Sequence, residues 1–478
     1  MAYQAVIGLE LHCELKSKSK VFSKAINGYS EIPNNHIRPL DLALPGTLPV
    51  LNFHSYKEAL KLALVLKCEI PEYMVFDRKN YYYPDLPKGY QITQQTAPVG
   101  INGELVIDLD GKEIAVRIHD IHLEEDTASL DHISNVTLID YNRSGVPLIE
   151  VVTYPCMHSA DEAVAFLENL RNILKFTEIS DADTKLGQMR CDVNVSLRYE
   201  GDYDLGTKVE IKNVNSFANV KEAINFEINR QTKLLDEGRG NEIIQETRRF
   251  DEETGTTISM REKVEAVDYR YFVEPNIPKI KIKEELLKEL KSEIPMLPRQ
   301  RKKLYIDEYD LSEYDANVLI KDKDLADFYQ ECVMLEIDPQ LASNYVTTTI
   351  LSYLNKDNLN IKDLYITPEM LKVILDKQVN NEISSKQARE LIDQVINEKK
   401  DVEEILKNKD VSQISDESEL LKIITEVLDN STSQISDYHN GRTNLFDYFV
   451  GQVMKSTKGK ANPNITKELL TKELAKRK

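Results

Sequence analysis

The chain has 478 residues, of which 29% are charged and 41% hydrophobic, and 80 Asp and Glu against 61 Lys and Arg give a net charge of −19. At roughly 150 residues per domain, this length predicts about three domains. No apolar stretch approaches the ~20 residues that a membrane span needs, and no basic and apolar leader opens the sequence. We therefore expect a cytoplasmic protein with no membrane partner, neither secreted nor embedded in a bilayer.

Cysteine use and the distribution of charge narrow the class further. The five cysteines are scattered and include no C-x-x-C pair, which predicts a reduced chain without disulfides. The charge is uneven, because residues 455–478 carry eight basic and two acidic side chains, a local balance of +6. If the protein binds a polyanion, this C-terminal end is where we expect the contact.

Three helix starts are visible in the first part of the chain. Ser55 and Ser159 each stand three residues before a glutamate, which is the capping-box pattern, and each opens an apolar run with helical spacing. The spacing predicts a third helix that begins after a Ser216 cap and ends at Gly238.

Strand patterns lie between these helices. Residues 190–198 and 208–212 alternate polar and apolar positions and are joined by a glycine-containing turn at 201–206, which predicts an antiparallel pair. The fold class expected is α+β, with an antiparallel-sheet cradle domain over residues 1–290 rather than a doubly wound nucleotide-binding fold.

The remainder of the chain has helical patterns. Strand signals fade after the proline-punctuated stretch 275–298. We expect an all-α helical domain over 291–406, a polar linker near 398–412 and a small all-α tail domain over 407–478.

The first candidate site is the strand pattern around His12. Glu10, His12 and Glu14 point to one face of such a strand, and apolar side chains point to the other. A carboxylate and an imidazole on one face could share a divalent metal or transfer protons. The alternative is the ordinary polar face of a half-exposed strand.

An acidic run at residues 119–126 gives a second candidate, with six ionisable groups in eight positions. Consecutive acids repel one another unless a cation or basic groups lie among them, and oxygen ligands suit Mg²⁺. A period of two does not decide whether Glu124 or Glu125 faces inward. A solvated acidic loop is the alternative.

Glu150 is the third candidate, because it interrupts an apolar strand that follows a turn containing Arg143. An acid in that position is costly unless it has a partner. A glutamate at the end of the strand that reaches solvent is the alternative explanation.

Two further polar segments could bind a ligand. Asp192, Asn194 and Ser196 line one face of the strand at 190–198, which is either a binding floor or an ordinary solvated face. Basic residues stand next to a run of tyrosines at 77–90, where they could hold a phosphate and a base ring or simply close a loop. The chain has no P-loop, no strand–G-x-G-x-x-G–helix, no H-E-x-x-H and no G-x-S-x-G, so nucleotide chemistry would need another scaffold.

Taken together, the segments are more specific than any one of them. In chain order they read VIGLELH, FDRKNYYYPDLPKGYQITQ, HLEED, DYNRSGVPLIE, RCDVNVSLR, KVEIKNVNSF, QETRRFD, DYRYFVEP and GQVMKSTKGKANP. This series resembles the GatB family of aspartyl/glutamyl-tRNA amidotransferase subunits. The resemblance runs from Val6 to the C-terminus.

The resemblance implies an ATP-dependent carbon–nitrogen ligase that uses ATP and Mg²⁺. Such a protein phosphorylates the side-chain carboxylate of glutamate mischarged on tRNA(Gln), or of aspartate on tRNA(Asn). Ammonia from a GatA-like amidase, which takes it from glutamine, then displaces the phosphate. A GatC-like small subunit completes the heterotrimer.

Site residues are implied in the same way. The resemblance makes Glu10, His12, Glu125 and Glu150 catalytic, with His12, Glu125 and Glu150 as metal ligands and Glu10 and Glu124 as neighbours or alternative ligands. Our own inference, beyond the resemblance, is that the nucleotide and phosphate side comprises Lys79, Tyr81, Arg143, Asp192, Asn194 and Ser196. The tRNA-binding residues expected in the tail are Lys455, Lys458 and Lys460.

The chain also departs from the family pattern. Members with a zinc site carry cysteine pairs in the segment 22–44, where this chain has Ser23, Ala25, Arg38 and Asp41, so we expect no zinc. Ala128 and Ser129 replace a usual glycine and lysine after the acidic run, which puts a phosphate contact there in doubt. Two other functions stay open: a non-catalytic tRNA-binding adaptor, and a stand-alone ligase for a small amino acid.

Overall fold

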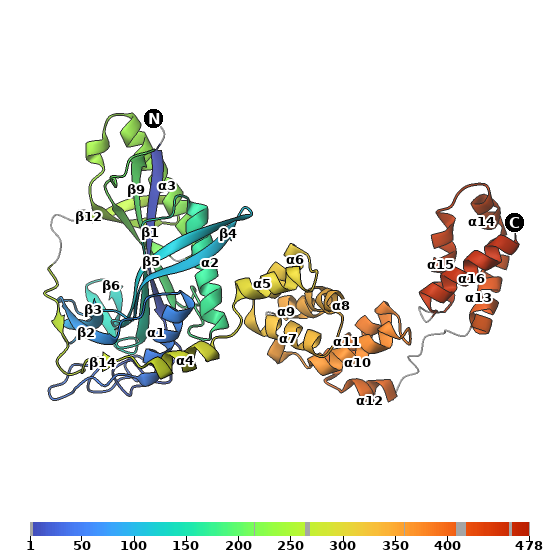
Figure 1. Cartoon of the computed structure of the whole chain (residues 1–478), viewed down its shortest axis with the longest axis horizontal. Coiled ribbons are helices and arrows are strands. Elements are labelled where there is room, and N and C mark those ends of the chain that lie inside the picture. Colours follow the sequence, from blue (N-terminus) through green and yellow to red (C-terminus); the bar gives the residue numbers. More distant parts are fainter. Residues whose placement is uncertain are drawn as a thin grey trace. The chain divides into compact units, whose positions relative to one another are not determined.

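The computed structural model divides the chain into two compact units, residues 1–298 and 299–478 (Figure 1). The residues that it describes are 3–214, 216–262, 268–357, 359–407, 417–457 and 461–477. The first unit combines sheets with helices and the second is helical, so the predicted α+β class is confirmed.

An eight-stranded sheet in the order β12-β11-β10-β9-β1-β8-β5-β4 forms the centre of the first unit. Its strands are β1 (Tyr3–Glu14), β4 (Gly100–Leu109), β5 (Lys112–Glu125), β8 (Pro147–Thr153), β9 (Met189–Tyr199), β10 (Val209–Val214), β11 (Glu246–Asp251) and β12 (Thr256–Glu262). The pairing of β9 with β10 confirms the antiparallel pair predicted from the alternating pattern. One neighbouring pair departs from the expected antiparallel order: β10 and β11 run parallel, because a helix crosses over between them.

Strand β1 lies in the middle of this sheet, between β8 and β9, and its two faces differ. Leu9, Leu11 and Cys13 are at most 1% exposed and belong to the apolar core, whereas Glu10 and His12 are partly exposed. The alternating sequence therefore gives β1 the two faces that were expected, an apolar face in the core and a polar face opposite to it.

The three longest helices described in this unit are α1 (Phe53–Val65), α2 (Ala160–Phe176) and α3 (Phe217–Asp236). Ser159 and Ser216 cap α2 and α3 as predicted, and α3 ends just before Gly238, whose φ of +71° suits glycine. The predicted cap of α1 was wrong. Asn52 caps that helix and Ser55 lies buried in its first turn, because the Asn52 side chain already accepts the first free N–H groups.

A smaller sheet and a hairpin complete the first unit. The sheet pairs β2 (Tyr73–Asn80) with β3 (Tyr90–Ala97), β13 (Phe272–Val273) and β14 (Ile280–Lys281), and the hairpin joins β6 (Ser129–Ile133) to β7 (Val136–Asp140). A short 3₁₀ turn, η1 (Gly240–Glu242), and helix α4 (Glu284–Glu293) finish the unit. Strand β3 lies beside β5, where the side chain of Gln91 donates a hydrogen bond of 2.7 Å to the carbonyl of Glu125. This contact attaches the smaller sheet to the polar end of β5.

The second unit contains two separate hydrophobic cores. One lies between Tyr305 and Ile405 and the other between Leu420 and Leu474. The helices are α5 (Pro298–Asp307), α6 (Glu313–Leu319), α7 (Lys323–Met334), α8 (Pro339–Asn344), the π-helix η2 (Tyr345–Ile350), α9 (Leu351–Asp357), η3 (Ile361–Asp363), α10 (Pro368–Val379), α11 (Ser385–Glu398), α12 (Val402–Lys407), α13 (Glu417–Asp429), α14 (Thr432–His439), α15 (Leu445–Ser456) and α16 (Pro463–Lys476). The expected linker at 398–412 is partly helical, since α12 lies within it. The domain limits at 290 and 406 stay a prediction.

Within the described ranges, no helix combines the length and apolarity that crossing a bilayer requires.

Candidate functional site

Three strands bring a row of ionisable side chains together on the polar face of the central sheet. His12 of β1 is paired with Glu150 of β8, and Glu150 is paired in turn with His122 of β5. Residues paired across strands point to the same face, so these side chains meet although they are far apart in the sequence. Glu124, two residues beyond His122, joins the row from β5.

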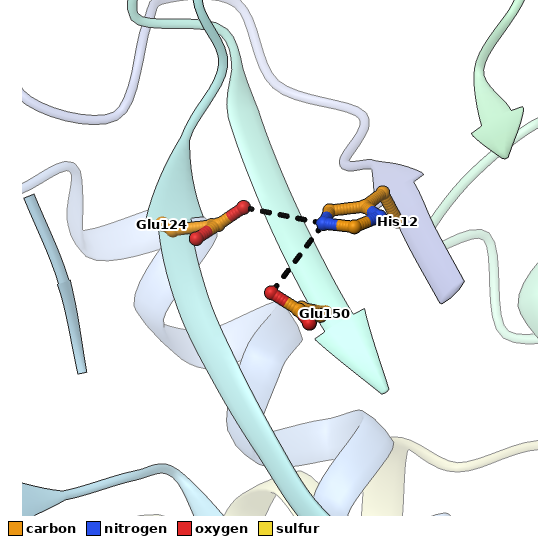
Figure 2. A group of neighbouring side chains, drawn as sticks. All are labelled: His12, Glu124 and Glu150. Carbon is orange, nitrogen blue, oxygen red and sulfur yellow. Dashed lines mark ion pairs between the residues drawn. The ribbon is translucent and has the colours of Figure 1, made fainter. Parts of the chain in front are cut away.

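Figure 2 shows His12, Glu124 and Glu150 pointing toward one another from these strands. The His12 Nε2 atom lies 3.4 Å from Glu150 Oε2 and 3.7 Å from Glu124 Oε1. The ligand atoms of all three residues lie within 4.8 Å of one another. Two carboxylates and one imidazole that converge in this way fit a divalent cation: the carboxylates suit Mg²⁺ and Mn²⁺, which prefer oxygen, and the imidazole adds a nitrogen ligand.

The electrostatics of this group also favour a cation. Burial raises the pKa of Glu124, and the negative charge of Glu150 raises it further. Burial alone would raise the pKa of Glu150, but His122 and His12 hold it well below its ordinary value. Burial would lower the pKa of His12, but the contact with Glu150 outweighs burial and the net shift is upward. Two carboxylates at close range thus already draw positive charge toward themselves.

Glu125 does not lie with this group, and its place is taken by Glu124. Successive residues of a strand point to opposite faces, and Glu124 shares its face with His122. Glu125 is 3% exposed, and its Oε1 accepts the N–H of Ile92 at 2.9 Å while its Oε2 accepts the Lys88 ammonium at 2.8 Å. The expected set of His12, Glu125 and Glu150 therefore needs this correction.

Glu10 belongs to a neighbouring acidic group rather than to that of His12. Glu10, Asp192 and Glu210 offer carboxylate oxygens within 4.8 Å of one another. Asn194 Nδ2 donates to Glu10 Oε1 at 3.0 Å, and the Lys212 ammonium contacts Asp192 and lies 3.3 Å from Glu210. This group is thus already partly neutralised by a lysine. Ser196 lies farther along β9, opposite Val6, and is 6% exposed.

Lys79 and Tyr81 lie beside the His12 group. The Lys79 ammonium lies 4.9 Å from the centre of the Tyr269 ring, and that ring lies 6.1 Å from the Tyr81 ring. Burial would lower the pKa of Lys79, but the charges of Glu124 and Glu150 outweigh burial and raise it. Lys79 therefore stays charged and faces the carboxylates.

Arg143 holds an acid that the sequence analysis did not single out. Its Nε and Nη2 atoms donate to the two oxygens of Asp126 at 2.6 and 2.9 Å, and Arg190 Nη2 donates to the same carboxylate at 2.8 Å. Asp126 is 5% exposed, and although burial would raise its pKa, the two guanidinium groups lower it. Asp126 thus fixes two arginines at the edge of the polar face. His122 was also missed, although its position two residues before Glu124 marks the shared face.

The segment in which a zinc site was considered is held by hydrogen bonds and an ion pair. The Asp41 carboxylate accepts from Ser23 Oγ at 3.1 Å and from the Arg38 N–H at 2.8 Å, and it lies 3.7 Å from the buried Lys20 ammonium. Ala25 accepts a hydrogen bond from the Lys20 N–H at 3.0 Å. A buried ion pair therefore ties this loop together.

After the acidic run, the Ala128 N–H donates to the Asp85 carbonyl at 3.0 Å, and Ser129 starts β6. In the tail, Lys455 is exposed near the end of α15. Lys458 and Lys460 lie outside the described residues.

Comparison with known proteins gives a consistent result. Residues 5–288 match the family model described as the GatB/GatE catalytic domain, and residues 327–474 match the model described as the GatB domain. Similar curated proteins are each named as the B subunit of the aspartyl/glutamyl-tRNA(Asn/Gln) amidotransferase. The protein from Geobacillus kaustophilus is 45% identical over 478 residues, which is 100% of both chains. That from Persephonella marina is 43% identical over 471 residues, covering 98% of this chain and 99% of the relative.

Proposed function

The chain belongs to the GatB family of amidotransferase B subunits, and on that basis we propose the reaction its polar sheet face performs. The protein transfers the γ-phosphoryl group of ATP to the side-chain carboxylate of glutamate on mischarged tRNA(Gln), or of aspartate on tRNA(Asn). Ammonia then attacks the acyl carbon, the C–O bond to phosphate breaks, and the amide forms with loss of a proton. It is thus an ATP-dependent carbon–nitrogen ligase.

The convergence of His12, Glu124 and Glu150 carries this proposal. A carboxylate reacts poorly with ammonia until one of its oxygens leaves as phosphate, and phosphoryl transfer depends mainly on positioning and charge neutralisation. We assign these three residues as the group that would hold Mg²⁺. Bound there, Mg²⁺ supplies positive charge against the phosphate oxygens.

The surrounding residues would position the reactants. Lys79 presents a charged ammonium beside the same carboxylates and would draw phosphate oxygens toward them. Arg143, fixed by Asp126, would do so from the neighbouring edge. On the nucleotide side we keep Tyr81, Asp192, Asn194 and Ser196 as candidates, because they lie on or beside the same sheet. Glu10 would act as part of the acidic group beside the proposed cation-binding residues. Glu125 would act indirectly, by holding the Lys88 ammonium in place.

Partners follow from the relatives' names, which describe each of them as the B subunit of an amidotransferase. We propose a heterotrimer with a GatA-like amidase as the ammonia source and a GatC-like small subunit. The tail over 407–478, with Lys455, Lys458 and Lys460, would contact mischarged tRNA. Aminoacyl-tRNA is consumed by ribosomes, so we place the reaction in the cytoplasm. We assign no zinc to the chain.

The test uses the complex reconstituted with the amidase and the small subunit. With Mg²⁺ and mischarged glutamyl-tRNA(Gln), we expect formation of ADP that depends on the tRNA, followed by glutaminyl-tRNA when glutamine is added. A complex that binds mischarged tRNA but forms no tRNA-dependent ADP would instead support the adaptor function. Amidation of a free amino acid by this chain alone would support the stand-alone ligase.

A further inference from the structure

A second histidine stands beside the proposed cation-binding group, but both of its ring nitrogens are engaged. His122 Nε2 lies 2.8 Å from Glu150 Oε2, and His122 Nδ1 lies 2.9 Å from Asp120 Oδ1. Carboxylate oxygens accept hydrogen bonds, so a ring nitrogen that carries a proton donates to the carboxylate it faces. Both ring nitrogens thus already have carboxylate partners, and the function of His122 must differ from that of His12.

The hydrogen bonds form a chain that ends at the surface. Asp120 Oδ2 lies 2.5 Å from His119 Nδ1, and the His119 side chain is 57% exposed. Asp120 and His122 are much less exposed, at 18% and 14%. Asp120 thus anchors the His122 ring from one side, and the ring contacts Glu150 from the other.

His122 contacts the Glu150 oxygen that faces the proposed cation-binding group. Glu150 Oε2 is also the atom that lies 3.4 Å from His12 Nε2. A glutamate side chain has three rotatable bonds, and ordering it when a cation binds costs conformational entropy. A donor that already holds this oxygen removes part of that cost.

We propose that His122 is a positioning residue that fixes Glu150 for cation binding, and that Asp120 fixes His122 in turn. This rests on the proposed cation-binding function of His12, Glu124 and Glu150. The cation class is a small divalent ion, and His122 acts on it through its hydrogen bond to Glu150, while the same Nε2 atom lies 3.9 Å from Glu124 Oε2. Each histidine then has its own function: His12 faces the cation, and His122 orients a ligand.

Two matched substitutions separate positioning from general damage to the fold. In His122→Gln, the amide N–H₂ can occupy the place of Nε2 and still donate to Glu150. In His122→Asn, the shorter amide can reach Asp120 but no longer reaches Glu150. His119→Ala removes the exposed contact with the same Asp120 and serves as a control.

The measurement is Mn²⁺ binding to the full-length chain in its complex, followed by the electron paramagnetic resonance signal of free Mn²⁺, without ATP or tRNA. We expect His122→Asn to weaken binding by roughly 10–100-fold, the range typical of residues that orient a metal ligand. His122→Gln should retain most of the affinity, and His119→Ala should match the wild type. At saturating metal, the amidation kcat of His122→Asn should recover.

The possible results distinguish a wrong cation-binding group from a wrong positioning function of His122. If the wild-type complex binds no Mn²⁺, the proposed cation-binding group is wrong and this inference fails with it. If the wild type binds and His122→Asn binds equally well, only the positioning function is wrong. An equal loss in His122→Gln and His122→Asn, at unchanged melting temperature, would also overturn it, because donation to Glu150 would then not be the cause.

Discussion

The polar face of the central sheet and the C-terminal helices present charge in two different ways. On the sheet, His12, Glu124 and Glu150 come from three strands, and their ligand atoms lie within 4.8 Å of one another. In the tail, Lys455 is exposed on α15 and belongs to a basic stretch in which charge is spread along the chain. The first arrangement depends on distances between elements and the second on local composition.

This contrast determines how each region should respond to substitution. In a buried cluster every group depends on its neighbours, so that removal of one charge leaves others unpaired. Exposed charges that contact a polyanion contribute separately and are screened by salt. We therefore expect large, non-additive effects on the sheet and small, additive effects in the tail.

Removal of a proposed ligand should have the largest effect. His12→Ala or Glu124→Gln should lower tRNA-dependent ADP formation by more than roughly 100-fold, above the range for residues that only orient a ligand. Glutamine hydrolysis by the partner amidase should remain measurable. Glu125→Gln provides the comparison in a Mn²⁺ binding experiment, because it should leave the cation affinity unchanged. A Glu124→Gln complex that binds Mn²⁺ as the wild type does would contradict this assignment.

Asp126 should show the next largest effect, on stability as well as activity. Arg143 and Arg190 both donate to Asp126 Oδ2, and Arg143 also donates to Oδ1, so in Asp126→Asn one accepting oxygen is replaced and a buried amide faces two guanidinium groups. We expect the free energy of unfolding to fall by roughly 1–3 kcal/mol, the cost of a poorly satisfied buried polar group. Denaturant unfolding measures it. Asp161→Asn, at an exposed ion pair with Lys221, should have little effect.

A pH-dependent contribution to stability should come from Glu274. This side chain is fully buried and accepts two hydrogen bonds from Arg78, at 2.5 and 3.1 Å. Burial would raise its pKa, but Arg78 and Asn276 outweigh burial and lower it below the ordinary value of 4.5. A lowered folded-state pKa means that the stabilisation is complete above pH 4.5 and is lost as the pH falls through the folded-state value.

The experiment compares the melting temperatures of wild type and Glu274→Gln from pH 7 down to the acid limit of solubility. The wild type should be more stable at pH 7, and the difference should shrink only below about pH 4.5. A difference that grows on acidification would refute the assignment.

The smallest effect for each residue is expected in the tail. Replacing Lys455, Lys458 and Lys460 together by Ala should flatten the dependence of tRNA affinity on salt by roughly 0.7–0.9 log units per decade for each lysine that touches a phosphate. ATP affinity should stay unchanged. Lys386→Ala, at an exposed lysine of α11, is the control. An unchanged salt slope in the triple variant would exclude these lysines as phosphate contacts.

The same comparison, between local features and features that join separate elements, explains which parts of this structure could be predicted from the sequence. The α+β class, the faces of β1 and the caps of α2 and α3 depend on neighbouring residues, and they were predicted correctly. The choice between Glu124 and Glu125 depends on which face of β5 meets β1 and β8, and a period of two cannot orient a strand relative to others. The contacts of Asp126 with Arg143 and Arg190 were hidden for the same reason, since they join three separate segments.

The central position of β1 in the sheet also has a consequence for the chain while it is being synthesised. This strand is synthesised before both of its neighbours, β8 and β9, which begin at Pro147 and Met189. Both edges of β1 therefore stay unpaired on the growing chain until these strands have left the ribosome. Open apolar edges invite pairing with other chains, and charged side chains on the strand oppose it. We expect the polar side chains of Glu10, His12 and Glu14 to oppose such pairing on the growing chain.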